Sequence, residues 1–256
     1  MIIRKLSNEI RDYEEIASTN DEMNRLVRSD DLAEGSIIRT DYQLAGKGHA
    51  GNSWLSERGK NLLFSILLKP DFLAPEKAFH ISRITSLALY EIIDNQCDGV
   101  KIKWPNDLLV RDQKIAGILI ENMITGQTIS HSIIGVGLNI NQTVFNPGIP
   151  APTSLKVEKG CHIDMNPLLS AFRRSLESWY NALLTGHEKM MMESYNQRLY
   201  QMRVTALYQS PAGRFTAMIR DVLPSGELVL ESGKGDILTF GFKEVEYLGA
   251  ITPDRN

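Results

Sequence analysis

Three glycines and two basic side chains gather in one short segment, Ala45–Trp54 (AGKGHAGNSW). The glycines fall in the G-x-G-x-x-G pattern of nucleotide-binding loops, at Gly46, Gly48 and Gly51. Such a loop can present backbone N–H groups, together with the charges of Lys47 and His49, to an anion. The next residues do not begin a convincing helix, and the surrounding segments do not alternate as strand, helix and strand. We therefore expect an anion-binding loop rather than a Rossmann site, and a flexible surface turn is the simpler alternative.

The segment Lys103–Asp107 (KWPND) places three polar side chains at the end of a predicted strand. Pro105 favours an extended conformation for the residue before it, which fixes the direction of the chain. A lysine can contact phosphate oxygens, an asparagine can orient a ligand and an aspartate can hold magnesium. An ordinary strand end with solvated polar residues explains the same pattern about as well.

Two apolar segments carry further polar residues and glycines. Lys114 opens the segment KIAGILIE, in which Gly117 would allow a ligand to come close, although a lone lysine in a turn is usually just solvated. The segment Gly135–Asn141 (GVGLNIN) has two glycines inside a predicted strand, and these cost stability unless something passes close to the backbone. Asn139 could recognise adenine, or it could simply form a turn at the end of the strand.

Composition excludes several other classes of protein. The formal net charge of −3 and the pI near 6.0 argue against a broad nucleic-acid-binding surface. The five histidines show no H-x-x-x-H spacing and no G-x-S-x-G motif occurs, so a zinc hydrolase and a serine hydrolase are not indicated. Cys97 and Cys161 lie far apart, as expected for a protein of the reducing cytoplasm. No apolar run is long enough for a membrane span, and the amino terminus does not resemble a secretory signal.

The chain has 256 residues, of which 43% are hydrophobic. Local patterns in this sequence predict the helices and strands that position the segments described above. Helices are predicted at about 20–28, 76–94, from 166 onward and at 188–200. Thr19 with Glu22 fits a capping box for the first helix, and Asn166 before Pro167 fits an N-cap for the third. Strands are predicted at 36–42, 61–68, 100–104, 108–110, 115–122 and 128–139. Together they indicate an α+β fold with a mixed sheet flanked by helices.

The pattern of the sequence changes after Arg203. Short β segments follow, separated by Pro224-Ser225-Gly226 and Gly233-Lys234-Gly235. A stretch of this kind fits a small closed barrel. We therefore expect two domains, a catalytic and ligand-binding domain at 1–203 and a barrel at 204–256.

In their fixed order, these motifs resemble those of the biotin protein ligases. The order is Ser18-Thr19-Asn20, then YQ–AG–G–G–W, KWPND–LL, KIAGILIE and G-x-G-x-N. The likeness is strong over about 10–145, weaker through Thr153-Ser154-Leu155, and the closing FGFKEVEYL is similar to the end of the family's SH3-like barrel. The resemblance implies the class II synthetase-like mixed sheet followed by that barrel. Because the chain reaches Ser18-Thr19-Asn20 so early, it resembles the single-function members that lack an amino-terminal DNA-binding domain.

The chemistry that this resemblance implies has two steps. The carboxylate of biotin attacks the α-phosphate of Mg-ATP to form biotinyl-AMP and pyrophosphate, and a lysine of a biotin carboxyl carrier domain then displaces AMP. Both reactants of the first step are anions, so cations and backbone N–H groups must offset their repulsion. The mixed anhydride is also prone to hydrolysis, so a loop must exclude water.

The resemblance assigns roles to individual residues. The biotin site would comprise Ser18, Thr19, Asn20 and Gln43, the loop residues Gly46, Lys47, Gly48 and His49, and Lys114, Gly117 and Gly135. Lys114 would be the main catalytic cation, aided by Lys103 and Lys47. The ATP site would comprise Lys103 and Asn106 at the phosphates, Asp107 near magnesium, Asn139 at adenine, and Trp54 beside the adenine or bracing the loop.

The loop departs from the family pattern Gly-Arg-Gly-Arg-x-Gly-Arg-x-Trp, because Lys47, His49 and Asn52 replace the three arginines. We expect retention of biotinyl-AMP to depend on pH through His49. A lipoate ligase is the nearest alternative. A non-catalytic partner-binding protein and a DNA-binding repressor are less favoured. The expected partners are biotin, ATP and the carrier domain, without DNA or membrane, in a monomer or homodimer.

Overall fold

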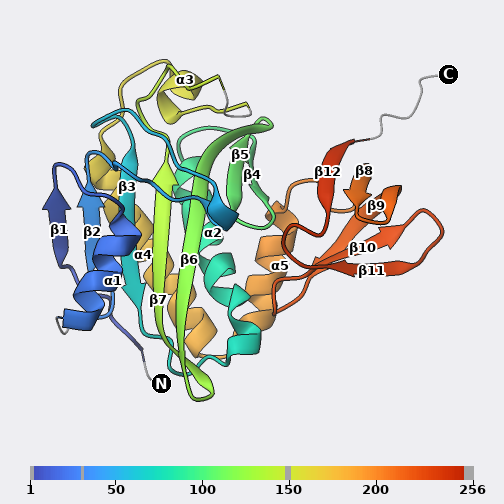
Figure 1. Ribbon diagram of the computed structural model, residues 1–256, viewed down its shortest axis with the longest axis horizontal. Coiled ribbons are helices and arrows are strands. Elements are labelled where there is room, and N and C mark those ends of the chain that lie inside the picture. Colours follow the sequence, from blue (N-terminus) through green and yellow to red (C-terminus); the bar gives the residue numbers. More distant parts are fainter. Residues whose placement is uncertain (1–2, 30–31, 148–150, 251–256) are drawn as a thin grey trace.

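The computed structural model describes residues 3–29, 32–147 and 151–250. Within these residues, a mixed sheet of seven strands has the order β1-β2-β3-β7-β6-β5-β4 (Figure 1). Its strands are β1 (Ile10–Tyr13), β2 (Ile37–Thr40), β3 (Leu62–Leu68), β4 (Val100–Lys103), β5 (Asp107–Val110), β6 (Gln113–Thr125) and β7 (Thr128–Leu138). This confirms the predicted mixed sheet. The edge strand β1 was not predicted, because its four residues, IRDY, are short and charged.

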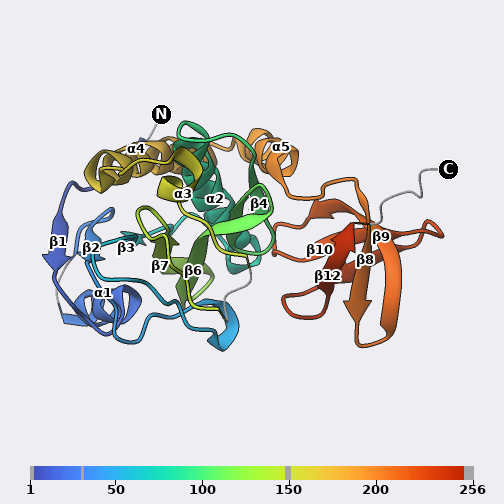
Figure 2. The ribbon, with the colours of Figure 1, turned by 90° about the horizontal axis from the view of Figure 1, so that it is seen from above.

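Helices cover both faces of this sheet. They are α1 (Thr19–Ser29), α2 (Phe79–Asp94), α3 (Leu155–Lys159), α4 (Met165–Leu184) and α5 (Glu188–Arg198). Seen from above, α1 lies on one side of the sheet, and α2 and α4 lie on the other (Figure 2). Every residue of β3 is buried as a result, and its Phe64 packs edge-on against Phe172 of α4 with the ring centroids 5.1 Å apart.

Two predicted helix caps are wrong. Asp164, not Asn166, is the N-cap of α4, and its carboxylate accepts the backbone N–H of Asn166 at 3.0 Å. Ser18, not Thr19, precedes α1, and its hydroxyl oxygen and carbonyl accept from the N–H groups of Asp21 and Glu22. At both helix starts, the capping side chain belongs to the residue just before the first helical residue.

The chain after Arg203 forms a second, antiparallel sheet of five strands with the order β11-β10-β9-β8-β12, at the position where the small β-rich domain was predicted. The strands are β8 (Thr205–Ser210), β9 (Gly213–Val222), β10 (Leu228–Ser232), β11 (Ile237–Phe240) and β12 (Glu246–Ala250). The outer ends of the two predicted domains, at 1–2 and 251–256, lie outside the described residues.

Buried contacts hold the second sheet against the first part of the chain. The Arg83 guanidinium of α2, fully buried, donates to the carbonyls of Val222 and Leu223. The indole N–H of Trp104 donates to the carbonyl of Gly226 at 2.8 Å. The end of β4 and the loops of the second sheet therefore meet at a defined interface. Among the helices that the structure describes, none has both the length and the apolar character needed to cross a bilayer.

Candidate active site

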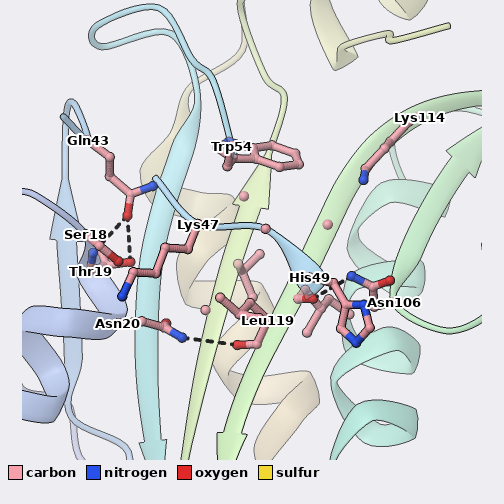
Figure 3. A pocket seen from close by; sticks show the side chains of 16 residues that line it. Ser18, Thr19, Asn20, Gln43, Lys47, His49, Trp54, Asn106, Lys114 and Leu119 are labelled. Carbon is pink, nitrogen blue, oxygen red and sulfur yellow. Dashed lines mark hydrogen bonds between the residues drawn. The ribbon is translucent and has the colours of Figure 1, made fainter. Parts of the chain in front are cut away.

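A cavity of about 40 Å³ lies between the start of α1, the glycine-rich loop and the centre of β6 and β7 (Figure 3). Predicted site residues from five separate segments of the sequence line it: Ser18, Thr19, Asn20, Gln43, Lys47, Gly48, His49, Trp54, Asn106, Lys114, Gly117 and Gly135. The fold thus brings most of the predicted site together, although their individual roles remain predictions. We call this cavity the first cavity.

The polar end of the first cavity is built at the amino terminus of α1. The backbone N–H of Thr19 donates to Oε1 of Gln43 at 2.8 Å, and the Thr19 hydroxyl donates to the same oxygen at 3.2 Å (Figure 3). Ser18 and Thr19 are both buried. Ser18, which caps α1, and Thr19, which lines the cavity, are therefore adjacent, and the turn that begins the helix fixes both hydroxyls.

Asn20 is held from two sides by groups that were not predicted. Its Nδ2 donates to the Glu121 carboxylate at 2.7 Å, and its Oδ1 lies 2.6 Å from the hydroxyl of the fully buried Ser65. A Cβ atom at Gly135 would lie 2.3 Å from the Asn20 Oδ1, so only glycine leaves room there. Ser65 could have been noticed as a lone polar residue in the buried segment LLFSILL, and Glu121 as the end of KIAGILIE.

The remaining strand glycines make room for the Trp54 indole. Gly117 and Gly137 face each other across β6 and β7, and Cβ atoms there would lie 2.9 Å and 2.3 Å from the Trp54 ring. This explains the glycines of both apolar segments, since a side chain does pass close to the backbone. The indole Nε1 is buried and has no hydrogen-bond partner among the described residues.

Lys114 lies at the opposite end of the first cavity from Gln43 (Figure 3). Its Nζ is 2.7 Å from a carboxylate oxygen of Asp107 and 5.6 Å from the centroid of the Trp54 ring. Both charged side chains remain partly exposed. The ammonium group is therefore held in place by a counter-ion and an aromatic face, and still has open access to an incoming anion.

The glycine-rich loop contacts the protein through its two basic side chains. Lys47 pairs with Asp21, and the hydrogen bond to that carboxylate raises the pKa of Lys47. The His49 ring packs against Phe242 of the second sheet. Burial lowers the pKa of His49, with a partly opposing contribution from Asp107. His49 is therefore neutral at pH 7 in this arrangement.

A second cavity, of about 370 Å³, adjoins the first and extends to the five-stranded sheet. The lysines that line it are Lys103, Lys114 and Lys243, and its carboxylates are Asp107 and Glu246. Aromatic rings line it as well: Trp54, Trp104, Tyr200, Tyr208 and Tyr247. Cations beside flat aromatic walls suit a ligand with a base and phosphates. Lys243 and the tyrosines were not predicted, because nothing local in their segments indicates a ligand.

Two predicted site residues, Gly46 and Asn139, line neither cavity. A Cβ at Gly46 would lie 2.4 Å from the carbonyl oxygen of Trp54, so this glycine permits the loop to fold back on itself. Asn139 is buried, and its Nδ2 donates to the carbonyl of Thr153 at 3.0 Å. Contact between Asn139 and adenine thus remains a prediction.

Within the described ranges, no group of three or more histidine, cysteine, aspartate or glutamate side chains is arranged to hold a metal ion. Asp107 is a single carboxylate already paired with Lys114. A magnesium ion at this site would thus depend mainly on ligands supplied by a nucleotide, as magnesium commonly does in phosphate-transfer enzymes.

A family model gives the class of protein to which this mixed sheet, glycine-rich loop and pair of adjoining cavities belong. A model of the biotin/lipoate A/B protein ligase family matches residues 13–139, from β1 to the end of β7. The chain therefore belongs to the biotin/lipoate A/B protein ligase family.

Individual relatives differ in how much they share with this chain. The bifunctional ligase/repressor BirA of Escherichia coli is 33% identical over 64% of this chain, which spans only half of that protein's length. The biotin–[acetyl-CoA-carboxylase] ligase of Paracoccus denitrificans is 26% identical over 85% of this chain and 92% of its own length. In fold, the chain is similar to the biotin protein ligase of Aquifex aeolicus solved with biotin and ATP, with a TM-score of 0.78, 21% identity, and coverage of 94% and 99% of the two chains.

Proposed function

We propose that this protein is an ATP-dependent ligase that joins biotin to a lysine of a biotin carboxyl carrier domain. In the first step a carboxylate oxygen of biotin bonds to the α-phosphorus of ATP, and pyrophosphate leaves. In the second step the lysine amine attacks the carbonyl carbon of biotinyl-AMP, loses a proton and forms an amide, and AMP leaves. The Aquifex aeolicus ligase, which has a similar fold, binds biotin and ATP in its solved complex, and this supports the proposal.

One observation carries the choice of biotin. At the buried end of the first cavity, the Ser18 hydroxyl can donate a hydrogen bond to a ligand and the Thr19 hydroxyl can accept one. The Ser18 oxygen accepts from the Asp21 N–H, so its proton remains for a ligand oxygen. The Thr19 proton points to Gln43 or to Ser65, so the Thr19 oxygen can accept from a ligand N–H. The ureido ring of biotin has both partners, a carbonyl oxygen and N–H groups.

The same observation disfavours lipoate, whose dithiolane ring has no N–H donor and only weakly accepting sulfur atoms. Lipoate would leave the Ser18 proton and a lone pair of the Thr19 oxygen without a partner. Sites built to hydrogen-bond a substrate reject analogues that lack the polar group by factors of about 10⁴–10⁵.

At the other end of the first cavity, Lys114 supports the adenylation step. We propose that its ammonium group neutralises the biotin carboxylate and the α-phosphate as they approach, with Lys103 at the outer phosphates in the second cavity. Asp107 orients Lys114 through their 2.7 Å ion pair. Magnesium enters as part of the nucleotide substrate, and Asn106, which lines both cavities, helps to orient the phosphates.

We further propose that the two parts of the chain supply different parts of the site. Residues 1–203 supply the biotin site, and residues 204–256 complete the second cavity through Lys243 and Tyr247. A cytoplasmic location would suit the ATP requirement, and Cys97 and Cys161 are both unpaired.

The test is pyrophosphate exchange into ATP, measured with purified protein and either biotin or lipoate. We expect biotin-dependent exchange at least about 100-fold above lipoate-dependent exchange. Labelled biotin with Mg-ATP should then appear on one lysine of an added carrier domain. Exchange that depends on lipoate, or no ATP-driven coupling of biotin, would overturn the proposal.

A further inference from the structure

The Glu121 carboxylate lies behind the predicted biotin site rather than in it. It does not line the first cavity, and it lines an outer groove together with Asp21 and Asn24 of α1. It nevertheless accepts a 2.7 Å hydrogen bond from Asn20, whose other polar atom faces inward. Glu121 is therefore connected to the cavity through one side chain.

The direction of the hydrogen bonds that start at Glu121 can be deduced from the donors available. The Glu121 carboxylate and the Leu119 carbonyl, 2.7 and 3.4 Å from Asn20 Nδ2, can only accept, so the amide must turn its N–H₂ group toward them. Its Oδ1 then faces Ser65, 2.6 Å away, and Ser65 must donate its single proton to that oxygen.

The same reasoning reaches Thr19. The Ser65 oxygen lies 2.8 Å from the Thr19 hydroxyl, and Ser65 has already given its proton to Asn20. The Thr19 proton must therefore point to Ser65 or to Gln43, and both choices leave an acceptor lone pair of Thr19 for the ligand. Glu121, Asn20, Ser65 and Thr19 thus form a relay of hydrogen bonds. Every member of this relay except Glu121 has a hydroxyl or an amide group that could rotate and exchange its donor for an acceptor.

We propose that Glu121 is a positioning residue that sets the hydrogen-bond polarity of the relay Asn20–Ser65–Thr19. It thereby keeps the Ser65 proton away from the Thr19 oxygen, whose lone pairs then remain for a ligand N–H. The identity of that ligand as biotin rests on the function proposed above. Because a carboxylate has no proton to donate, Glu121 is the one group of the relay that cannot reverse its role. Its effect is on recognition of the ureido ring and not on the reacting carboxylate.

The first experiment compares Glu121→Gln with the wild type in biotin-dependent pyrophosphate exchange. Loss of the charged acceptor should raise the KM for biotin about tenfold. The kcat at saturating biotin and the KM for ATP should stay within about twofold. Glu22→Gln is the matched control, because it changes a carboxylate of α1 that accepts from Arg25 and Tyr13 and does not belong to the relay, and its kinetics should not change.

The second experiment exchanges the hydrogen-bond donor and acceptor between Asn20 and Glu121. Asn20→Asp should raise the KM for biotin much further, because two carboxylates then face each other at the 2.7 Å contact. In Asn20→Asp/Glu121→Gln, the glutamine amide can donate to the new carboxylate, which can still accept from Ser65. This double variant should recover at least about tenfold of the loss, and Asn20→Asp/Glu121→Ala should recover less, because alanine relieves the repulsion but donates nothing.

The outcomes separate this proposal from the proposed function. If the wild type shows no biotin-dependent exchange, both fail. If the wild type is active and Glu121→Gln matches it, or if the alanine double variant recovers as well as the glutamine one, the polarity role of Glu121 is overturned and the biotin ligase function stands. Melting temperatures of all variants identify any that fail to fold.

Discussion

The ring of His49 packs edge-on against the ring of Phe242, with centroids 5.4 Å apart and planes at 84°. His49 belongs to the glycine-rich loop and Phe242 follows β11, so this pair joins the loop over the first cavity to the second sheet. The centroid of the Phe242 ring also lies 5.5 Å from that of Trp104 and 6.1 Å from that of Phe79, and these rings anchor it to the first part of the chain. The second sheet thus contributes to the position of the loop.

Removal of the Phe242 ring should loosen the loop. Because an aromatic pair contributes about 0.5–1.5 kcal/mol beyond its buried area, Phe242→Ala should speed release of biotinyl-AMP roughly 2- to 10-fold. Rapid dilution of the enzyme–adenylate complex measures this rate. Ile237→Ala removes another exposed apolar side chain of the same sheet and should leave the rate unchanged. An unchanged rate in Phe242→Ala would show that the ring pair does not restrain the loop.

Lys114→Ala should reduce adenylate formation at least about 100-fold, since it removes a cation placed where negative charge develops. The melting temperature should change little, because the Lys114–Asp107 pair is partly exposed. Pyrophosphate exchange and a thermal melt check the two statements. Lys101→Ala, which removes an exposed lysine of β4, serves as the control. Normal exchange in Lys114→Ala would remove this residue from its proposed role.

Protonation of His49 should tighten the loop on the adenylate. Burial lowers its pKa from the ordinary value near 6.5, and Lys114 and Lys243 lower it further, against Asp107, which raises it. The imidazole therefore gains its charge over a pH range below that of an ordinary histidine. Release of biotinyl-AMP should slow over that range, and the profile of His49→Gln should be flat. Equal profiles for both proteins would contradict a role for this titration.

The Trp54 indole should move when ligands bind. It fills the space above Gly117 and Gly137 and leaves about 40 Å³ in the first cavity, whereas ligand sites commonly measure about 300–1,000 Å³. Biotin with ATP should therefore change the tryptophan fluorescence, and Trp54→Phe should lose most of that change. Trp179→Phe should keep it, because Trp179 is bonded to Glu91 away from both cavities. A full response in Trp54→Phe would mean that this indole stays in place.

Local patterns in the sequence were sufficient for much of this protein. The alternation over 100–104 and the apolar run at 61–68 predicted strands that the structure confirms at Val100–Lys103 and Leu62–Leu68. The order of the short motifs indicated the family and most of the residues that line the first cavity. These features depend on neighbours along the chain, so local patterns are enough to reveal them.

The partners of those residues were decided by the tertiary structure alone. Ser65 and Glu121 meet Asn20 from positions 45 and 101 residues away, and Trp54 lies on glycines of two different strands. Such contacts depend on strand register, because a shift of one residue would turn every side chain to the other face of the sheet. The pairing of Leu119 with Gly135 in β6 and β7 is set by the whole sheet and its packing, and no local pattern of residues specifies it.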